Sequence, residues 1–193
     1  MDFTRKAIWV KSGHRTPNPT TPNYVGVVSR ENICILLTRS VVHRVSVKAS
    51  DIRDAYLQAP TYEKHSIICG PDFGTENERK RAVIVRALYG GKSAGSNFWH
   101  HLQSCMDHLG FESSKYDPYV WMKLSTLADG ETPYYEYVLL YVDDCLVISE
   151  SVIRSEIGKY FRSKEELIVY PGQYLGGKLL KGAWCFGSKQ YVE

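Results

Sequence analysis

The stretch Val138-Leu139-Leu140-Tyr141-Val142-Asp143-Asp144-Cys145-Leu146-Val147-Ile148 places two adjacent carboxylates inside an otherwise apolar run. The flanking residues are β-branched, aromatic or leucine, which is the composition of buried strands. Burying a bare carboxylate is costly, so we expect a tight turn between two strands, with Asp143-Asp144 at its tip. There the two carboxylates could hold a divalent cation. Asp-Asp is also an ordinary turn dipeptide, and composition alone leaves both interpretations open.

The composition of the chain indicates a folded protein whose cysteines are reduced. With 193 residues, 44% of them hydrophobic, the chain is long enough for one domain, or for a domain and a fragment. It contains no apolar run long enough to cross a membrane and no signal segment after its first residues. The five cysteines form no CxxC pair, which argues against a disulfide framework or a zinc site. We therefore expect an intracellular protein, cytoplasmic or nuclear, that is neither secreted nor in a membrane.

The basic residues are concentrated near the N-terminus. Residues 1–44 contain seven Lys or Arg and only two acidic side chains, a net charge of +5, so the remainder carries about −2 of the total of +3. A basic segment beside an acidic site suits a polyanionic partner such as nucleic acid. A solvated basic face explains the same charge distribution equally well.

Periodicity and turn residues predict an α+β chain with an antiparallel sheet and helices on one face. Ser29 is a candidate N-cap for a helix over 30–44, and Gly110 a candidate end for a helix over 94–109. A short helical turn at 53–57 and a helix over 153–161 are also expected. The predicted strands cover residues 5–11, 45–52, 65–69, 81–86, 119–124 and the hairpin at 134–149, followed by a second hairpin from 173–180 and 183–186.

A second carboxylate pair, Asp51 and Asp54, lies at the end of a predicted strand about ninety residues before Asp143. In an antiparallel sheet, Asp51 can lie beside the turn at Asp143 and Asp144. Three such carboxylates could hold two Mg²⁺ or Mn²⁺ ions about 3.5–4 Å apart, which would clamp the oxygens of a phosphoryl displacement. Asp54 fits better as a helix N-terminal acid, which the helix dipole stabilises.

Several segments then resemble one enzyme family. Tyr141-Val142-Asp143-Asp144 resembles the YxDD box of reverse transcriptases, and the segment from Asp51 to Ala59 resembles their first aspartate motif. Copia-type retrotransposon polymerases have patterns similar to the segment from Ala87 to Ser93 with Trp99, to Leu109-Gly110-Phe111 with Asp117-Pro118, and to Tyr174-Leu175-Gly176. These motifs occur in the family's order over nearly the whole chain.

The resemblance implies a partial right-handed polymerase made of fingers and palm. The fingers would cover about residues 1–45 and 60–92, the palm about 46–59 and 93–180, and the start of the primer-grip or thumb region 172–193. We expect most of the thumb and the RNase H, integrase and protease regions to be missing. The implied activity is RNA-directed DNA synthesis on a primed RNA or DNA template from deoxynucleoside triphosphates, with other parts of the Pol polyprotein as further partners.

The resemblance also implies a role for each matching residue. Asp51, Asp143 and Asp144 would be the catalytic metal ligands, and Tyr56 would lie under the sugar and exclude a 2′-hydroxyl. The other implied residues bind nucleotide (Ile52, Gly90, Lys92, Arg5, Lys6), grip the primer (Tyr174, Leu175, Gly176) or protonate pyrophosphate as the general acid (Lys164).

Alternatives and departures accompany these assignments. Tyr56 could be a core aromatic, Lys92 a solvated lysine at a helix start, and Lys164 a surface lysine. Ile8 stands where the family has an arginine, for which Arg5 or Lys11 could substitute. Gly91 stands where leucine is usual. The alternative functions are a truncated, catalytically inactive nucleic-acid-binding remnant of the same element, and a two-metal nuclease.

Overall fold

The computed structural model describes residues 9–20, 23–150, 160–163, 168–169, 173–175 and 177–178. Arg5, Lys6, Lys164 and Gly176 lie outside these residues, as do most of the predicted helix over 153–161 and the predicted strand at 183–186. The chain divides into two compact units. Unit 1 contains residues 1–25 and 54–102, and unit 2 contains residues 26–53 and 103–193. No helix in the described part combines the length and the apolar character that a membrane span needs.

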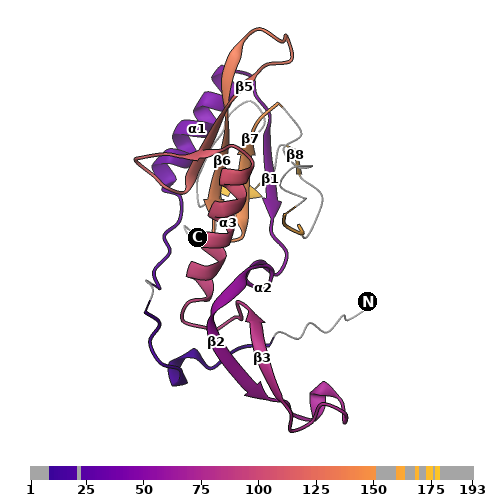
Figure 1. Ribbon diagram of the computed structural model, residues 1–193. Coiled ribbons are helices and arrows are strands. Elements are labelled where there is room, and N and C mark those ends of the chain that lie inside the picture. The colour runs from indigo at the N-terminus through magenta and orange to yellow at the C-terminus, as the bar shows by residue number, and fades with distance from the viewer. Residues whose placement is uncertain are drawn as a thin grey trace, which may run out of the picture. The chain divides into compact units, whose positions relative to one another are not determined.

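Unit 2 is built on an antiparallel sheet (Figure 1). Its strands, in spatial order, are β4 (Glu112–Ser113), β5 (Val120–Thr126), β6 (Pro133–Tyr141), β7 (Asp144–Ile148), β1 (Val47–Asp51) and β8 (Ile168–Val169). β1 pairs with β7 along its whole length, so a strand from early in the chain lies beside the strand that follows the Asp-Asp dipeptide. This arrangement confirms the predicted α+β class with an antiparallel sheet.

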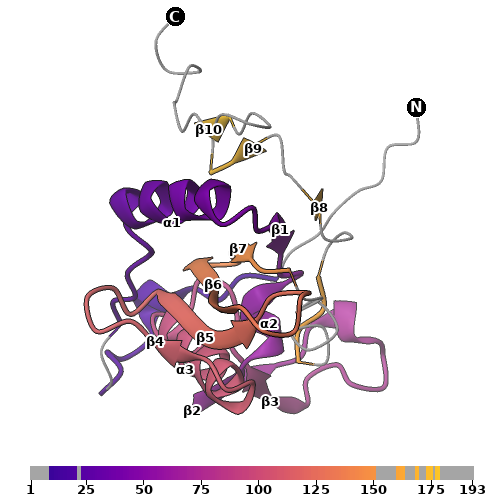
Figure 2. The same ribbon diagram turned by 90° about the horizontal axis from the view of Figure 1, so that it is seen from above.

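Helix α1 (Arg30–Val42) covers one face of this sheet (Figure 2). Ser29 caps its start as predicted, because the Ser29 side chain accepts a hydrogen bond from the Asn32 backbone N–H at 3.2 Å. The buried face of α1 and the sheet form one apolar cluster, whose members include Ile33, Leu36, Leu37, Val47, Leu139 and Leu146. The helix is therefore held by burial of apolar side chains on alternate positions of β6, β7 and β1.

The opposite face of the sheet is buried as well. Val138, Leu140, Cys145 and Val147 alternate with the residues that face α1, and each is at most 3% exposed. The part of α3 (Ala94–His108) that belongs to unit 2 lies on this second face (Figure 2). The prediction of helices on one face is therefore wrong. Continuous apolar runs such as 138–140 and 145–148 are typical of strands covered on both sides.

Unit 1 contains a two-stranded antiparallel ribbon, β2 (Pro60–Ile68) with β3 (Arg81–Arg86), as well as the short helix α2 (Ala55–Gln58) and the first turns of α3. The described residues of this unit also form two 3₁₀ turns, η1 (Gly13–Arg15) and η2 (Pro71–Phe73). The bounds of β3 are those predicted, but β2 begins five residues earlier than expected. The predicted strand over 5–11 is wrong for its described part, since residues 9–12 form no regular element.

The short strands β9 (Gln173–Tyr174) and β10 (Gly177–Lys178) pair with each other. Residues 173–180 were predicted to be one strand of a hairpin with residues 183–186. Instead, residues 173–178 contain a hairpin of their own. Leu175, between the two strands, has a φ of 45°, which is the left-handed conformation that a tight turn requires.

Candidate active site

The β6–β7 hairpin has a two-residue turn. Tyr141 pairs with Asp144, so the turn residues are Val142 and Asp143, and Asp144 is the first residue of β7. The predicted pair of strands is confirmed, but the tip lies one residue earlier than expected. Val142 has a φ of 56°. A β-branched side chain rarely adopts this conformation, so the turn stores backbone strain beside Asp143.

The end of β1 lies next to this turn. Asp51 is the last residue of β1, and its Cα is paired with that of Asp144. The following residue, Ile52, donates its backbone N–H to the Asp143 carbonyl oxygen at 2.8 Å. The Oδ1 atom of Asp51 and the Ile52 side chain are both buried. The sheet register thus brings together the three aspartates that the sequence singled out.

The pKa of the Cys145 thiol is affected by the same three carboxylates. Burial raises the pKa of Cys145 to about 12, and the charges of Asp144, Asp143 and Asp51 act in the same direction. All three are therefore close enough to destabilise a negative charge at this buried sulfur. Carboxylate oxygens are the donors that Mg²⁺ prefers. No set of three or more His, Cys, Asp or Glu side chains within the described ranges is arranged as a metal site, so the metal role of the three stays a prediction.

The neighbouring candidates Asp54 and Tyr56 lie in unit 1. Asp54 is the N-cap residue of α2, with a φ of 48°, and its side chain makes no capping hydrogen bond. The Tyr56 ring is half-buried, 4.9 Å from the Tyr89 ring and 5.9 Å from the Phe98 ring between centroids. Tyr56 is thus part of an aromatic cluster, and its role under the sugar is untested.

The Gly90 turn is in close contact with the N-terminal loop. The Lys11 backbone N–H donates to the Tyr89 carbonyl oxygen at 2.7 Å. Gly90 has a φ of 79°, and a Cβ there would collide with the Lys11 carbonyl oxygen. A Cβ on Gly13 would collide with the Gly90 carbonyl oxygen in the same way. Both positions therefore require glycine for the two backbones to approach each other.

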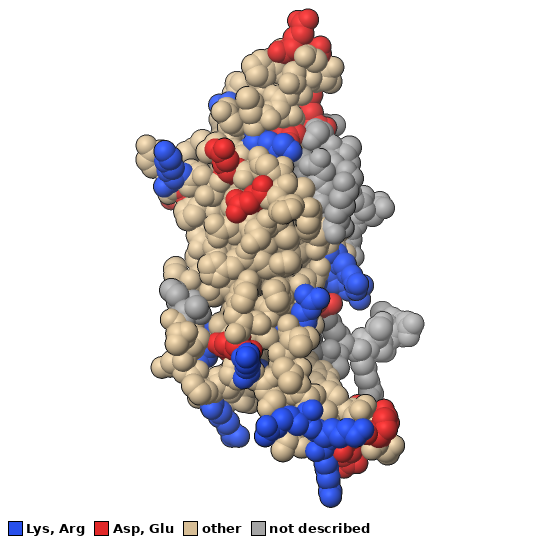
Figure 3. Space-filling view, in the orientation of Figure 1, with Lys and Arg blue, Asp and Glu red and all other residues tan. Residues whose placement is uncertain are grey.

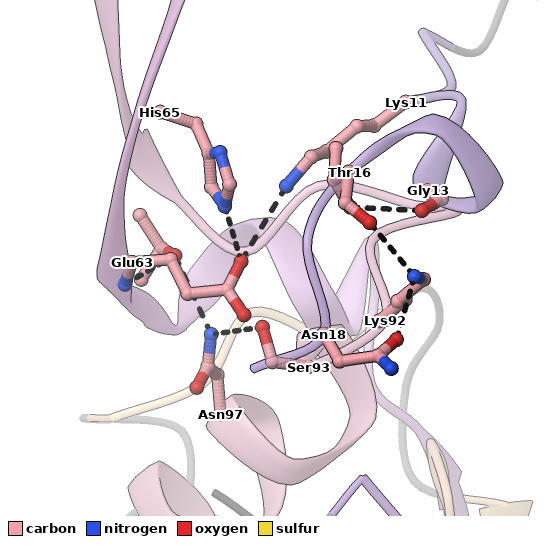
Figure 4. A network of polar contacts seen from close by, with 10 residues as sticks. Lys11, Gly13, Thr16, Asn18, Glu63, His65, Lys92, Ser93 and Asn97 are labelled. Atoms are coloured by element: carbon pink, nitrogen blue, oxygen red, sulfur yellow. Dashed lines mark hydrogen bonds and ion pairs between the residues drawn. The ribbon is translucent and has the colours of Figure 1, made fainter. Parts of the chain in front are cut away.

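Lys92, which lies just before α3, forms hydrogen bonds to the N-terminal loop at Thr16 and Asn18 (Figure 4). Its Nζ donates to the Thr16 carbonyl oxygen and to Asn18 Oδ1, each at 2.8 Å. Lys92 is therefore engaged within the protein rather than solvated. Its predicted contact with a nucleotide is untested.

A second polar network joins the N-terminal loop to β2, and it was not predicted from the sequence. Glu63 Oε2 lies 2.5 Å from His65 Nε2 and 3.5 Å from Lys11 Nζ (Figure 4). Burial alone would raise the pKa of Glu63, but hydrogen bonds from Ser93 and His65 and the charge of Lys11 outweigh it and lower the pKa. Lys11, considered above as a substitute for the missing arginine, is paired with this carboxylate. The alternation of Glu63 and His65 on one face of β2 was the available signal.

The primer-grip candidates lie partly in the core. Tyr174 is 5% exposed and belongs to the apolar cluster under α1, while Leu175 is half-buried. The Tyr174 hydroxyl is buried and has no hydrogen-bond partner within the described residues. Burial also raises the pKa of this hydroxyl, with Cys145, Asp144 and Tyr141 adding to the effect. A primer contact by these residues is not tested by the structure.

Comparison with known protein families identifies the class of protein to which the chain belongs. A family model described as reverse transcriptase (RNA-dependent DNA polymerase) matches residues 6–176, which include all three aspartates and the Gly90 turn. The chain therefore belongs to the reverse transcriptase family, in its copia-type branch. No curated protein matches the chain.

Proposed function

We propose that this chain is the fingers and palm of an RNA-directed DNA polymerase that extends a primer 3′-hydroxyl on an RNA or DNA template. The observation that carries the proposal is the pairing of Asp51 with Asp144 beside the strained turn that holds Asp143. Family membership supplies the reaction class. In this proposal the palm is the sheet of unit 2, and the β2–β3 ribbon belongs to the fingers.

The three aspartates supply the oxygen donors that a pair of Mg²⁺ or Mn²⁺ ions requires. Bound there, the ions would lower the pKa of the primer hydroxyl and stabilise the charge of the leaving pyrophosphate. The chain's own contribution is to hold Asp51 and Asp144 on adjacent strands and to fix Asp143 through the Ile52 N–H. Such a fixed donor set needs little rearrangement during the reaction.

The remaining assignments concern the substrate. Tyr56 would lie under the sugar of the incoming nucleotide, and Gly90 would let its backbone approach the nucleotide closely. Lys92 would act by holding the loop at Thr16 and Asn18 against the Gly90 turn. Leu175 would contact the primer beside Tyr174. Arg5, Lys6, Gly176 and Lys164, which lie outside the described residues, keep the roles that the family resemblance implies.

The test is primer extension with Mg²⁺ on RNA and DNA templates. Asp143→Asn should abolish nucleotide addition, because an amide is a neutral and weaker ligand, while primer–template binding stays near the wild-type level. Asp129→Asn is a matched control, since Asp129 is an exposed carboxylate in a turn between strands. Equal activity in Asp143→Asn would refute the assignment of the site.

The same assay separates the alternatives. A nucleic-acid-binding remnant would bind primer–template and add no nucleotide in either protein. A two-metal nuclease would shorten the strands when nucleotides are omitted, and Asp143→Asn would prevent this. Either outcome would overturn the proposed polymerase activity while leaving the family membership in place.

A further inference from the structure

A pocket opens between the C-terminal end of α1 and the first half of β6, and all the residues that line it belong to unit 2. Its walls include Arg39 and His43 from the end of α1 and Tyr135 and Tyr137 from β6. Tyr135 precedes Tyr141 by six positions, about 20 Å along the strand, so the pocket is separate from the candidate active site. Its volume of about 220 Å³ is below the roughly 300–1,000 Å³ of enclosed small-molecule sites, so a ligand here would lie partly outside it.

Two tyrosine rings and a guanidinium group lie side by side in this pocket. The ring centroids of Tyr135 and Tyr137 are 6.3 Å apart, and the guanidinium carbon of Arg39 lies 5.8 Å from the Tyr137 centroid. Tyr135 is 42% exposed, whereas Tyr137 is half-buried. An exposed aromatic ring beside a guanidinium plane offers two flat surfaces on which a further planar group can stack.

The charges around the pocket favour an anionic ligand. Arg39, His43 and Arg44 are all exposed at this end of α1. Among the described residues, no Asp or Glu lines the pocket. Burial raises the pKa of Tyr137, and the charge of Arg39 only partly opposes this effect. The Tyr137 hydroxyl is therefore neutral at physiological pH and does not repel an anion.

The end of α1 is less unfavourable to an anion than most helix C-termini. The last carbonyl groups of a helix carry partial negative charge. Here the Ser40 carbonyl oxygen accepts the Val45 N–H at 2.9 Å, and the Val41 carbonyl oxygen accepts the Arg44 N–H at 3.2 Å. Glycine is the usual residue in the left-handed position of such a helix end, which Arg44 occupies with a φ of 54°. An arginine there gives up backbone ease and adds a third cation.

The carboxylates nearest in the sequence are held by other groups. Figure 3 shows Asp and Glu side chains at the upper tip of the view, where the loop between β5 and β6 lies in Figure 1. In this loop Asp129 accepts hydrogen bonds from the backbone N–H groups of Glu131 and Thr132. Glu136, 3% exposed, accepts one from the Tyr134 hydroxyl. An anionic chain in the pocket would leave it on the side away from the acidic tip.

We propose that this pocket binds single-stranded nucleic acid. One base stacks on the Tyr135 ring beside the Arg39 guanidinium, and the adjoining phosphates contact Arg39, His43 and Arg44. Rings that stack bases, placed beside cations that pair with phosphates, bind single strands without sequence preference. A duplex keeps its bases stacked inside, so the pocket selects unpaired strands. The inference does not rest on the proposed polymerase activity, because it needs neither metal nor nucleotide.

An acidic protein segment is the other class of ligand with matching charge. Its carboxylates could pair with the cations at the end of α1. They have no flat ring to place on Tyr135, however, and that exposed ring is the feature that distinguishes this pocket from an ordinary basic surface. The combination of ring and cations therefore favours a nucleic-acid strand.

Photo-crosslinking to the full chain tests the proposal. The probe is a short single-stranded RNA that carries 5-iodouracil, which crosslinks to aromatic side chains in contact with it. EDTA is present, so no metal-dependent reaction interferes. Mass spectrometry of the digested protein should find the crosslink on Tyr135 or its neighbour Tyr137. The crosslink yield at rising RNA concentration then gives a dissociation constant for this pocket alone.

Removal of one cation should weaken binding at the pocket. Arg39→Gln should raise the dissociation constant measured from the crosslink about fivefold or more, because it removes both a stacking plane and a phosphate contact. Lys115→Gln is the matched control, since Lys115 is an exposed cation of unit 2 outside the pocket and should leave the constant unchanged. Circular dichroism of each variant shows whether its fold is retained.

Substitution of Tyr135 separates stacking from packing. Tyr135→Leu should raise the dissociation constant of the same RNA, measured by fluorescence anisotropy, about fivefold or more, because leucine has no ring on which a base can stack. Tyr135→Phe keeps the ring and should bind as the wild-type chain does. Tyr116→Ala, at a fully exposed tyrosine elsewhere in unit 2, should also have no effect.

Four results would overturn the proposal. The crosslinks could all lie outside residues 134–137, or Arg39→Gln and Tyr135→Leu could bind RNA as tightly as the wild-type chain. An abasic strand of the same length could compete as well as the complete strand, which would mean that phosphates alone are bound. A poly-glutamate peptide that displaces the RNA as well as unlabelled RNA does would assign the pocket to acidic protein segments instead.

Discussion

At the scale of single residues, the conformation of Val142 has a measurable cost. Its φ of 56° places a β-branched side chain in the left-handed region, which costs L-residues roughly 1–2 kcal/mol. Val142 is 38% exposed, so the apolar surface that its side chain buries is too small to offset this conformational cost by packing alone. The strain persists because the pairs Tyr141–Asp144 and Asp51–Asp144 fix the ends of the turn.

Val142→Gly should therefore stabilise the fold. Glycine adopts positive φ without steric cost, but it also has more conformational freedom than valine in the unfolded chain, which offsets part of the gain. We expect the net free energy of unfolding to rise by about 1 kcal/mol. Urea denaturation at neutral pH measures the change. Val142→Ala is the control, because alanine keeps the Cβ and hence most of the penalty. A less stable glycine variant would show that the turn is not strained.

Tyr56 gives the second prediction at this scale. If its ring lies under the nucleotide sugar, Tyr56→Ala should raise the ratio of kcat/KM for ribonucleotides to that for deoxynucleotides. The contacts of Tyr56 with Tyr89 and Phe98 mean that alanine will also lower stability. A ratio of two substrates measured on one preparation is insensitive to the folded fraction, so it isolates the steric effect. Tyr56→Phe should leave the ratio unchanged, and an unchanged ratio in Tyr56→Ala would remove the steric role.

At the scale of secondary-structure elements, Asp117 ties the start of α1 to the chain before β5. One carboxylate oxygen accepts hydrogen bonds from the Ser29 backbone N–H at 3.0 Å and from the Asn32 side chain at 2.6 Å, and the other accepts from the Tyr119 N–H at 3.0 Å. Burial alone would raise the pKa of Asp117, but these hydrogen bonds outweigh it and lower the pKa. The carboxylate form is therefore favoured in the folded protein.

Asp117→Asn should lower the free energy of unfolding by about 2 kcal/mol at neutral pH, since an amide places a donor where the carboxylate only accepts. A native pKa below the unfolded value of about 3.9 contributes stability above that pH, and this contribution is lost as the pH falls through the native pKa. The difference between wild type and variant should therefore shrink in acid. Denaturation curves at pH 7 and at about pH 3 measure both effects. A constant difference would show that the charge of Asp117 is not involved.

The elements show what local sequence can and cannot determine. Ser29 and Gly110 marked the ends of α1 and α3 within about two residues, because caps are local signals. The early start of β2 was missed, since the segment 60–64 mixes Pro, Thr, Glu and Lys and becomes a strand only by pairing with β3. The second covered face of the sheet was missed for the same reason, because it depends on which distant helix packs there.

At the scale of the whole molecule, the order of the motifs predicted more than their local chemistry did. Asp51 lies 92 positions before Asp143 in the sequence. The order of the motifs implied that an antiparallel sheet brings these two residues together, and the register of β1 with β7 shows that it does. The contacts of Lys92 with Thr16 and Asn18 could not be predicted, because they depend on the path of an irregular loop. Long-range polar contacts of this kind leave no periodic signal in a sequence.

The distribution of charge over the whole chain predicts how it meets nucleic acid. Residues 1–44 carry a net charge of +5 in a chain of net +3, so phosphate contacts should dominate the binding of primer–template. Two phosphate contacts already predict a fall in affinity of about tenfold between 50 and 200 mM salt. Fluorescence anisotropy of a labelled primer–template over a salt series measures the slope, and an uncharged peptide nucleic acid of the same sequence is the control. Affinity that stays constant across the series would mean that apolar or base contacts hold the strand, and that the basic N-terminal residues contribute nothing to its capture.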